Sequence, residues 1–245
     1  AAAVASFGRE QREGRGVASA AAELASNIRK HPGAGGEVVI KQALSANEIL
    51  RGARALTPQV LLEAHGQMVG GGLCDQAGVF RTVPVKAGQS AFPHHAEVPA
   101  AVPLFCKVLE EKVISHATAG AAAKGAWALY WLLAIHPFRD GNGRMSRAVM
   151  NWVLTKCGVP FECHVIPTAQ HRTLYRQALE ATHALGGGGG NLDLITQLVA
   201  AAICRGFRAL AQVEARVTRR ADETAGDTAV RAWRGAQRAP TCAVC

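Results

Sequence analysis

The chain has 245 residues, of which 49% are hydrophobic and 18% charged, so it can build a sizeable core as one domain with an extension or as two small domains. No run approaches the roughly 20 apolar residues of a membrane-spanning helix, and we therefore expect no membrane span. The net charge is +9, and eight arginines face four acidic residues between positions 205 and 238. Such a tail binds nucleic acid, membrane surfaces or acidic partners in some proteins, but more often it is only solvated.

The N-terminal part contains one helical pattern between two irregular stretches. Residues 1–16 mix Gly, Arg and Glu and are predicted to be disordered, whereas residues 17–30 have helical periodicity. Ser19 can cap the start of that helix, and Glu23 follows one turn later. Residues 31–36 are rich in Gly and Pro, which predicts a linker.

Two further helices and one β-like segment follow. Residues 37–55 have a helical pattern, and Thr57-Pro58 starts another helix with a cap and a first-turn proline in the expected order. Three glycines at 70–72 end it. Residues 78–88 are the one alternating segment of the chain and, taken alone, predict a surface hairpin.

Helical patterns at residues 102–115 and 119–135 lead into the stretch that carries most of the polar chemistry. The second of them ends in ten apolar or aromatic residues, 126–135, which is typical of a buried helix. Pro137 disfavours helical geometry at the residue before it, so we expect the helix to end near His136.

The next residues predict a tight loop followed by a new helix. Asp140-Gly141-Asn142-Gly143 tolerates positive φ, which lets successive backbone N–H groups converge on one point. The helical pattern resumes at Arg144, with Asn142 as its predicted N-cap, and stops near Gly158. A glycine-bent loop in front of a helix N-terminus is an anion site.

Four side chains in this stretch fit a phosphate site. His136 has an ordinary pKa suited to proton abstraction near neutral pH. Asp140 offers the hard oxygen that Mg²⁺ accepts when phosphates and waters complete its coordination. Arg144 and Arg147, three residues apart, can fork onto phosphate oxygens. Together these groups predict phosphoryl or nucleotidyl transfer.

Simpler interpretations stay open beside this one. Asp-Gly and Asn-Gly are strong hairpin signals, although the flanks have helical rather than alternating periodicity. The spacing Gly141-x-Gly143-x-x-Ser146 approaches the dinucleotide fingerprint, but a helix rather than a strand precedes it. His136 can be a satisfied core histidine, and the arginines can be ordinary surface charge.

Residues 136–147 resemble the signature of the Fic family, H-P-F-x-[D/E]-G-N-G-R-x-x-R, with every fixed position present. The resemblance implies an all-α helical bundle with one small β-hairpin, whose members mostly move AMP from ATP to a protein hydroxyl. It implies an N-terminal extension at 1–44, the Fic domain at 45–213 and a basic, flexible tail at 214–245.

The resemblance also implies roles for single residues. Asp140 holds Mg²⁺ against the phosphates of ATP, and His136 takes the proton of a target Ser, Thr or Tyr hydroxyl that attacks the α-phosphorus. Nucleotide contacts then come from Gly141, Asn142, Gly143, Arg144 and Arg147, the last of these at the γ-phosphate.

Two segments outside the signature match the family in part. G-x-F-R-x-x-x-V-x-x-G at 78–88 resembles the start of the flap, a hairpin at 79–90 that covers the nucleotide and aligns the protein target, with Val85 and Gly88 near the nucleotide. Phe92-Pro93-His94-His95 resembles the P-P-H-P stretch after the flap, from which Phe92 and His95 depart.

Downstream, residues 168–182 have a helical pattern. Arg172-x-x-Tyr175-x-x-Ala178-Leu179 within it resembles R-x-x-Y-Y-x-A-L, in which a tyrosine contacts the adenine side; Tyr175 matches, but position 176 is Arg. Five glycines at 186–190 predict a linker. Asn191 then caps a last predicted helix at 192–213.

A regulatory motif is also suggested by the resemblance. Ser19-x-x-x-Glu23 resembles the family's inhibitory motif [S/T]-x-x-x-E-[G/N], in which the glutamate pairs with the second signature arginine, here Arg147. Leu24 stands where the family has Gly or Asn. The alternative is that Glu23 is a capping-turn carboxylate on a surface helix.

Other functions remain open on the same residues. The same site in the family can remove AMP, or transfer another nucleotide or phosphocholine. A branch of the family that transfers the γ-phosphate has lysine in place of the second loop glycine, so Gly143 disfavours that reaction here. A non-catalytic, basic interaction module is a further alternative. We expect a protein partner and a cytoplasmic location, with a homodimer open and nucleic acid disfavoured. Cys106 and Cys204 are predicted to be small core residues.

Overall fold

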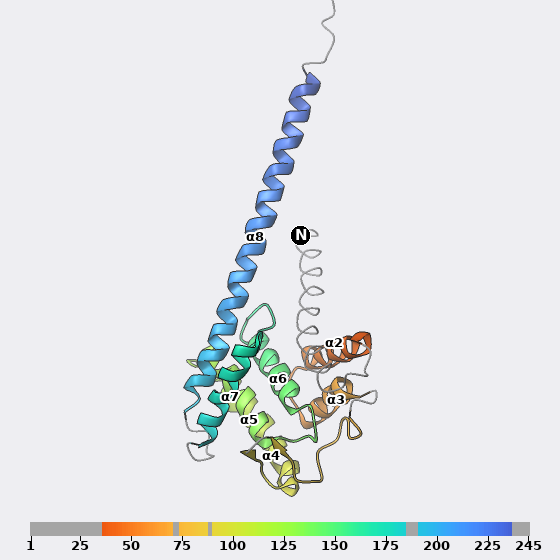
Figure 1. Cartoon of the computed structure of the whole chain (residues 1–245), viewed down its shortest axis with the longest axis vertical. Helices are drawn as coiled ribbons and strands as arrows, with labels where there is room; N and C mark the ends of the chain where they lie inside the picture. The colour runs from red at the N-terminus through yellow and green to blue at the C-terminus, as the bar shows by residue number, and fades with distance from the viewer. Residues whose placement is uncertain (1–35, 71–73, 88–89, 185–190, 237–245) are drawn as a thin grey trace, which may run out of the picture. The chain divides into compact units, whose positions relative to one another are not determined.

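The computed structural model describes residues 36–70, 74–87, 90–184 and 191–236. Within them the chain is helical apart from one two-stranded ribbon, which confirms the predicted all-α class with a small hairpin (Figure 1). The helices are α2 (Gly36–Gly52), α3 (Pro58–Val69), α4 (Val98–Val108), α5 (Ala121–Ile135), α6 (Asn142–Lys156), α7 (Ala169–Ala184) and α8 (Asp193–Ala236). The predicted helix at 17–30 and the glycine linker at 186–190 lie outside the described residues.

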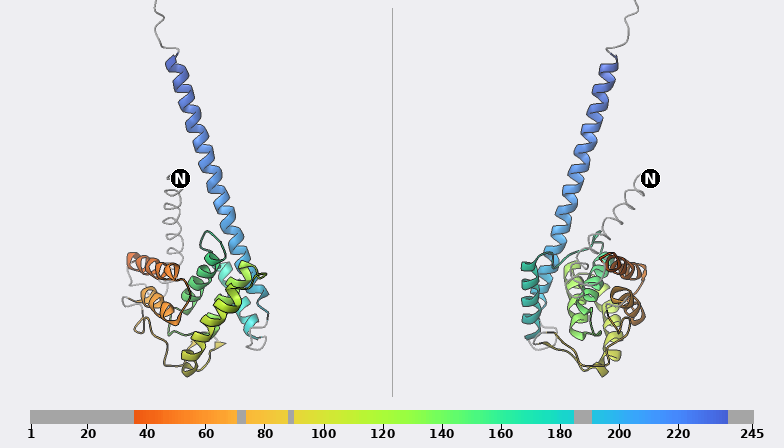
Figure 2. Two further views of the ribbon diagram at one scale, coloured as in Figure 1. Left: turned by 180° about the vertical axis from the view of Figure 1, so that it is seen from behind. Right: turned by 45° about the vertical axis from the view of Figure 1, so that its right-hand side comes forward.

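Helices α5 and α6 are the centre of the fold, because core side chains cover them on two sides. Ala128 and Leu132 of α5 belong to a first core cluster with α2, α3, α4 and Phe138. Leu129 and Tyr130 of the same helix belong to a second core cluster with α7 and the first turns of α8. This two-sided burial explains why α5 is apolar around its whole circumference. Figures 1 and 2 agree in placing α2 and α3 on one side of the pair and α7 on the other.

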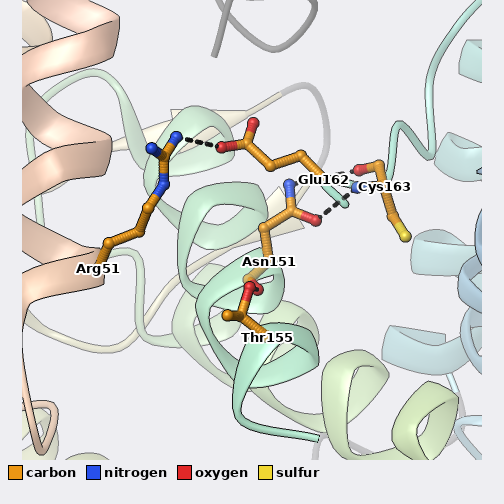
Figure 3. Close-up of polar contacts among 5 residues, drawn as sticks. All are labelled: Arg51, Asn151, Thr155, Glu162 and Cys163. Atoms are coloured by element: carbon orange, nitrogen blue, oxygen red, sulfur yellow. Dashed lines mark hydrogen bonds and ion pairs between the residues drawn. The ribbon is translucent and has the colours of Figure 1, made fainter. Parts of the chain in front are cut away.

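Polar contacts fix the start of α3 and the loop after α6. Thr57 caps α3 as predicted, its hydroxyl accepting a hydrogen bond from the Val60 N–H at 3.2 Å. After α6, the Asn151 carboxamide binds Cys163 N at 2.8 Å and Cys163 O at 3.3 Å. Arg51 at the end of α2 pairs with Glu162 at 2.8 Å, which fastens the loop after α6 to α2 (Figure 3).

The β-like segment is shorter than the sequence predicts. Strand β1 (Lys86–Ala87) pairs antiparallel with β2 (Ser90–Ala91), with Lys86 opposite Ala91. Residues 78–85 form no strand, so the prediction of an extended hairpin from 78 was wrong. Pro84 provides one physical reason, because proline cannot donate a ladder hydrogen bond.

The helix before α5 also differs from its prediction. Helix α4 starts at Val98, four residues earlier than the pattern indicated, and a π-helical segment continues it over Leu109–Ile114. A 3-10 turn, His95–Glu97, precedes it. Cys106 is buried here as expected, whereas Cys204 in α8 is exposed, so the core prediction was wrong for Cys204.

Helix α8 continues to Ala236, well past the predicted end at 213. Alanine and arginine, two strong helix formers, recur through this part of the chain. Packing divides the chain into a compact unit up to Ile203 and a second unit from Cys204, which holds the rest of α8. Within α8, Asp193–Arg219 is long and apolar enough to cross a membrane by length and composition. The core helix of a soluble protein can have the same length and composition.

Candidate active site

His136 ends α5 in a left-handed conformation, with φ 51° and ψ 56°, the one positive φ at a non-glycine residue among those the structure describes. Its Nδ1 lies 3.0 Å from the Leu133 carbonyl oxygen. Because a carbonyl only accepts, this contact assigns the ring proton to Nδ1. The Nε2 atom of the neutral ring is then the one able to accept a proton.

The loop after His136 closes on itself through Asn142. Its carboxamide accepts from the Phe138 N–H at 2.9 Å and donates to the Phe138 carbonyl at 2.7 Å. Asn142 is the first residue of α6 rather than its N-cap; the cap is Gly141, with φ 81°. The predicted capping role of Asn142 was therefore wrong, because its side chain faces back into the loop.

Gly141 allows this loop to lie directly against α3. A Cβ atom at this position would lie 2.8 Å from Val69 Cγ1 and 3.1 Å from His65 Nε2. The positive φ adds a second reason for glycine here.

His65 on α3 connects the loop to the segment before the flap. It is fully buried and stacks on Phe138, with ring centroids 3.7 Å apart. The Gly78 N–H donates to its Nδ1 at 3.0 Å, so its Nε2 carries the proton and donates to the Asp140 carbonyl at 2.9 Å. Burial, the largest cause, lowers the pKa of His65 to about 4.

Sequence reasoning missed His65, although a signal existed. It lies four residues after Leu61 and three before Met68, on the buried face of the predicted helix. A titratable residue on an apolar helix face has to find hydrogen-bond partners when it is buried.

The charged side chains of the signature gather at the start of α6. Asp140 is 30% exposed, and its Oδ2 lies 3.3 Å from Nη2 of Arg144, whose side chain is 3% exposed. Arg147 is half-buried, with Nη1 3.3 Å from the place of a Cβ at Gly143. The N–H groups of residues 142–144 have no partner four residues earlier within the helix and point out of its N-terminus. The loop thus combines an anion site with two guanidinium groups.

This loop supplies enough ligands for Mg²⁺ only when a phosphate group binds the ion as well. Asp140 supplies a single carboxylate, and the described residues contain no group of three or more His, Cys, Asp or Glu side chains suited to a metal. Mg²⁺ takes one or two carboxylates when phosphate oxygens and water supply its other ligands.

A cavity of about 750 Å³ adjoins His136. Its walls come from α5, α7, both strands of the ribbon and Phe92, and they include Tyr130, Leu133, Arg176, Leu179, Glu180 and His183. Its size suits a nucleoside or a side chain of a protein target.

Not every predicted site residue lies beside His136 and the start of α6 in the described part of the chain. Tyr175 is 6% exposed in the second core cluster, and its neighbour Arg176 lines the cavity instead. Val85 is half-buried before β1 and does not line that cavity. Gly88, Ser19 and Glu23 lie outside the described residues.

Part of the chain is similar to known proteins. The profile of the Fic/DOC family matches residues 55–154. A protein adenylyltransferase Fic of Culex quinquefasciatus is 34% identical over 130 residues, which are 52% of this chain and 25% of that protein. The chain spans about a quarter of the length of several such curated relatives.

Solved structures share the fold. Fic-1 (residues 134–508) from C. elegans has a TM-score of 0.58 at 21% identity, over 74% of this chain and 55% of that one. IbpAFic2 covalently tethered to Cdc42 has a TM-score of 0.54 at 16% identity, over 78% of this chain and 61% of that one. The profile match and the curated relatives identify a Fic/DOC domain at residues 55–154 of this chain.

Proposed function

We propose that this protein is a Mg²⁺-dependent adenylyltransferase that moves AMP from ATP to a Ser, Thr or Tyr hydroxyl of a protein. The observation that carries the proposal is the arrangement of His136 beside the N-terminus of α6. The Nδ1–H of His136 is bound to Leu133, which leaves Nε2 as the base, and the anion site lies a few residues away. The curated relatives named protein adenylyltransferase Fic support the same reaction.

In this mechanism the phosphates of ATP lie at the start of α6. The backbone N–H groups of residues 142–144 and the side chain of Arg144 bind the α- and β-phosphates, and Arg147 binds the γ-phosphate. Mg²⁺ bound between Asp140 and the phosphates would neutralise charge on the departing group. Two hydrogen bonds between Asn142 and Phe138 already hold the loop backbone closed, so the N–H groups at the start of α6 are fixed before the nucleotide binds.

The chemical step is an in-line substitution at the α-phosphorus. The target hydroxyl oxygen forms the new bond to this atom, while the bond to the bridging oxygen of the β-phosphate breaks. Pyrophosphate leaves with the electron pair of that bond. The hydroxyl proton passes to Nε2 of His136, which becomes an imidazolium.

The position of the ribbon supports a protein as the target. The ribbon residues Ala87 and Ser90 line the same cavity as His136. A peptide can add to such an edge through main-chain hydrogen bonds, which tolerate many sequences. One structure with this fold is covalently tethered to Cdc42, which is consistent with a protein as acceptor.

One observation favours a second candidate, transfer of a different nucleotide. Arg176 lines the cavity where the family has a tyrosine, and its guanidinium presents only donors. Guanine, uracil and cytosine carry carbonyl oxygens that adenine lacks, and these acceptors would satisfy the guanidinium donors. Transfer from UTP, CTP or GTP in preference to ATP would support this candidate.

The role of His136 separates catalysis from binding. His136→Ala should lower the transfer rate by about 10²–10⁴-fold, because only proton transfer is lost. Calorimetry should find ATP affinity within about twofold of the native protein. His116→Ala, a change at an exposed histidine, is the matched control and should alter neither quantity. Loss of ATP binding together with activity would make His136 a structural residue.

A further inference from the structure

Arg81 carries a buried charge next to the catalytic loop. The residue is 2% exposed, yet in the described part of the chain its side chain donates only to backbone carbonyls: His136 at 2.7 Å, Pro93 at 2.6 Å and Val83 at 3.2 Å. Its own backbone N–H donates to the Pro137 carbonyl at 2.9 Å. Arg81 therefore binds the first two residues of the catalytic loop, His136 and Pro137. It also binds Val83 near the start of the flap and Pro93 just after it.

The hydrogen bonds of Arg81 explain why a charge is tolerated here. Burying a charge is costly unless hydrogen bonds compensate it. No carboxylate among the described residues is hydrogen-bonded to this guanidinium, so the three carbonyls stabilise it. A shorter or neutral side chain cannot reach three carbonyls at once, because only the guanidinium fork has donors in these directions.

Phe92 contacts the ring of His136, whereas Arg81 contacts its backbone. Its ring stacks on the imidazole of His136, with centroids 3.7 Å apart and planes inclined by 19°. Phe92 directly precedes Pro93, whose carbonyl binds Arg81. The backbone of His136 is thus held by Arg81 near the start of the flap, and its ring by Phe92 just after the flap.

The conformation of His136 makes such support necessary. A left-handed backbone is unfavourable at a non-glycine residue and persists only when its surroundings fix it. The bond from Arg81 Nε to the His136 carbonyl fixes the peptide plane that follows the strained residue. The stacked ring of Phe92 limits rotation of the imidazole, which preserves the bond from Nδ1 to Leu133.

We propose that Arg81 and Phe92 are positioning residues that set the backbone and the ring of His136, so that the two ends of the flap control the geometry of the base. The catalytic consequence rests on the proposed function, whereas the effect on the imidazole does not. Without Arg81, the peptide after His136 relaxes toward ordinary geometry and Nδ1 moves away from Leu133. A displacement of about 1 Å at a reacting group can lower the rate by roughly 10²-fold.

Nitrogen-15 NMR of the histidine side chains tests the structural part without any substrate. Native protein should show His136 with Nδ1 protonated and Nε2 unprotonated, assigned by comparison with His136→Gln. Arg81→Lys, which keeps the charge but loses the fork, should give a mixture of tautomers. Phe92→Leu, which removes the stack from a surface segment, should do the same. Arg139→Lys is the matched control, because Arg139 is 49% exposed in the same loop and pairs only with Asp75 in the described part of the chain.

Kinetics test the catalytic part. Arg81→Lys should lower kcat by about 10²-fold with the KM for ATP changed less than threefold. In the His136→Ala background the same substitution should have no further effect on kcat, because the group that Arg81 positions is gone. Equal losses in both backgrounds would show that Arg81 acts on the fold rather than on His136.

The NMR and the kinetic measurements distinguish this inference from the proposed function. A native tautomer in both Arg81→Lys and Phe92→Leu would overturn this inference, whatever the activity. Mixed tautomers in these variants, with no nucleotide transfer by the native protein, would retain the inference and contradict the proposed function. If Arg81→Lys does not fold, Phe92→Leu carries the test alone.

Discussion

Protonation of His65 should destabilise this fold in mildly acidic solution. Both ring nitrogens are occupied: Nδ1 accepts from the Gly78 N–H, and Nε2–H donates to the Asp140 carbonyl. An imidazolium has no acceptor, so a second ring proton would face the Gly78 N–H and break that bond. Protonation is therefore unfavourable in the folded protein, which agrees with a pKa lowered to about 4.

The size of the effect follows from the two pKa values. The ordinary pKa is 6.5, so the unfolded chain takes up a proton at a higher pH than the folded protein does. Stability from neutral His65 is fully present above pH 6.5 and is lost as the pH falls toward 4. Each pKa unit is worth about 1.4 kcal/mol, which gives about 3 kcal/mol in total and about 2 kcal/mol between pH 7 and pH 5.

Urea unfolding followed by circular dichroism at pH 7, 6 and 5 measures this contribution. His65→Gln removes the titrating group, so its free energy of unfolding should fall by about 2 kcal/mol less than that of the native protein over this range. His116→Gln, at an exposed histidine, should keep the native pH dependence. Parallel curves for the native protein and His65→Gln would refute the reasoning, because His65 would then titrate alike in both states.

Two other predictions concern the metal and control of the site. Asp140→Asn keeps the shape of the side chain and removes its charge, so ATP binding by calorimetry should weaken in the presence of Mg²⁺ and stay unchanged without it; equal binding under both conditions would remove Asp140 from the metal site. Glu23→Gly should raise self-modification with labelled ATP about tenfold or more if Glu23 occupies Arg147, and Arg147→Ala should abolish the gain. An unchanged rate in Glu23→Gly, with native circular dichroism, would make Glu23 an ordinary surface residue.

The sequence could predict the order of elements around the site because the signals there are local. Pro137 marks the end of α5, and the apolar run before it marks a buried helix. The left-handed backbone of His136 was not predictable, because only a few per cent of non-glycine residues adopt it, although histidine does so more often than most. It depends on Arg81, which lies 55 residues earlier in the chain and binds the His136 carbonyl.

Two side chains near the site face partners that only tertiary contacts determine. Asn142 has the right residue type for an N-cap, but the loop places the Phe138 backbone within its reach. Tyr175 matches a family motif, yet the packing of α7 turns it into the second core cluster and presents Arg176 to the cavity. The local sequence therefore does not determine whether a side chain faces the loop, the core or the cavity.

Intact-mass spectrometry after incubation with ATP and Mg²⁺ tests the central claim most directly. The native protein and Glu23→Gly should each gain one or more AMP groups, with release of pyrophosphate, and His136→Ala should gain none. Addition of a phosphate group would indicate γ-phosphoryl transfer instead. No adduct on either active form, or an equal AMP gain on His136→Ala, would contradict nucleotidyl transfer with His136 as the base.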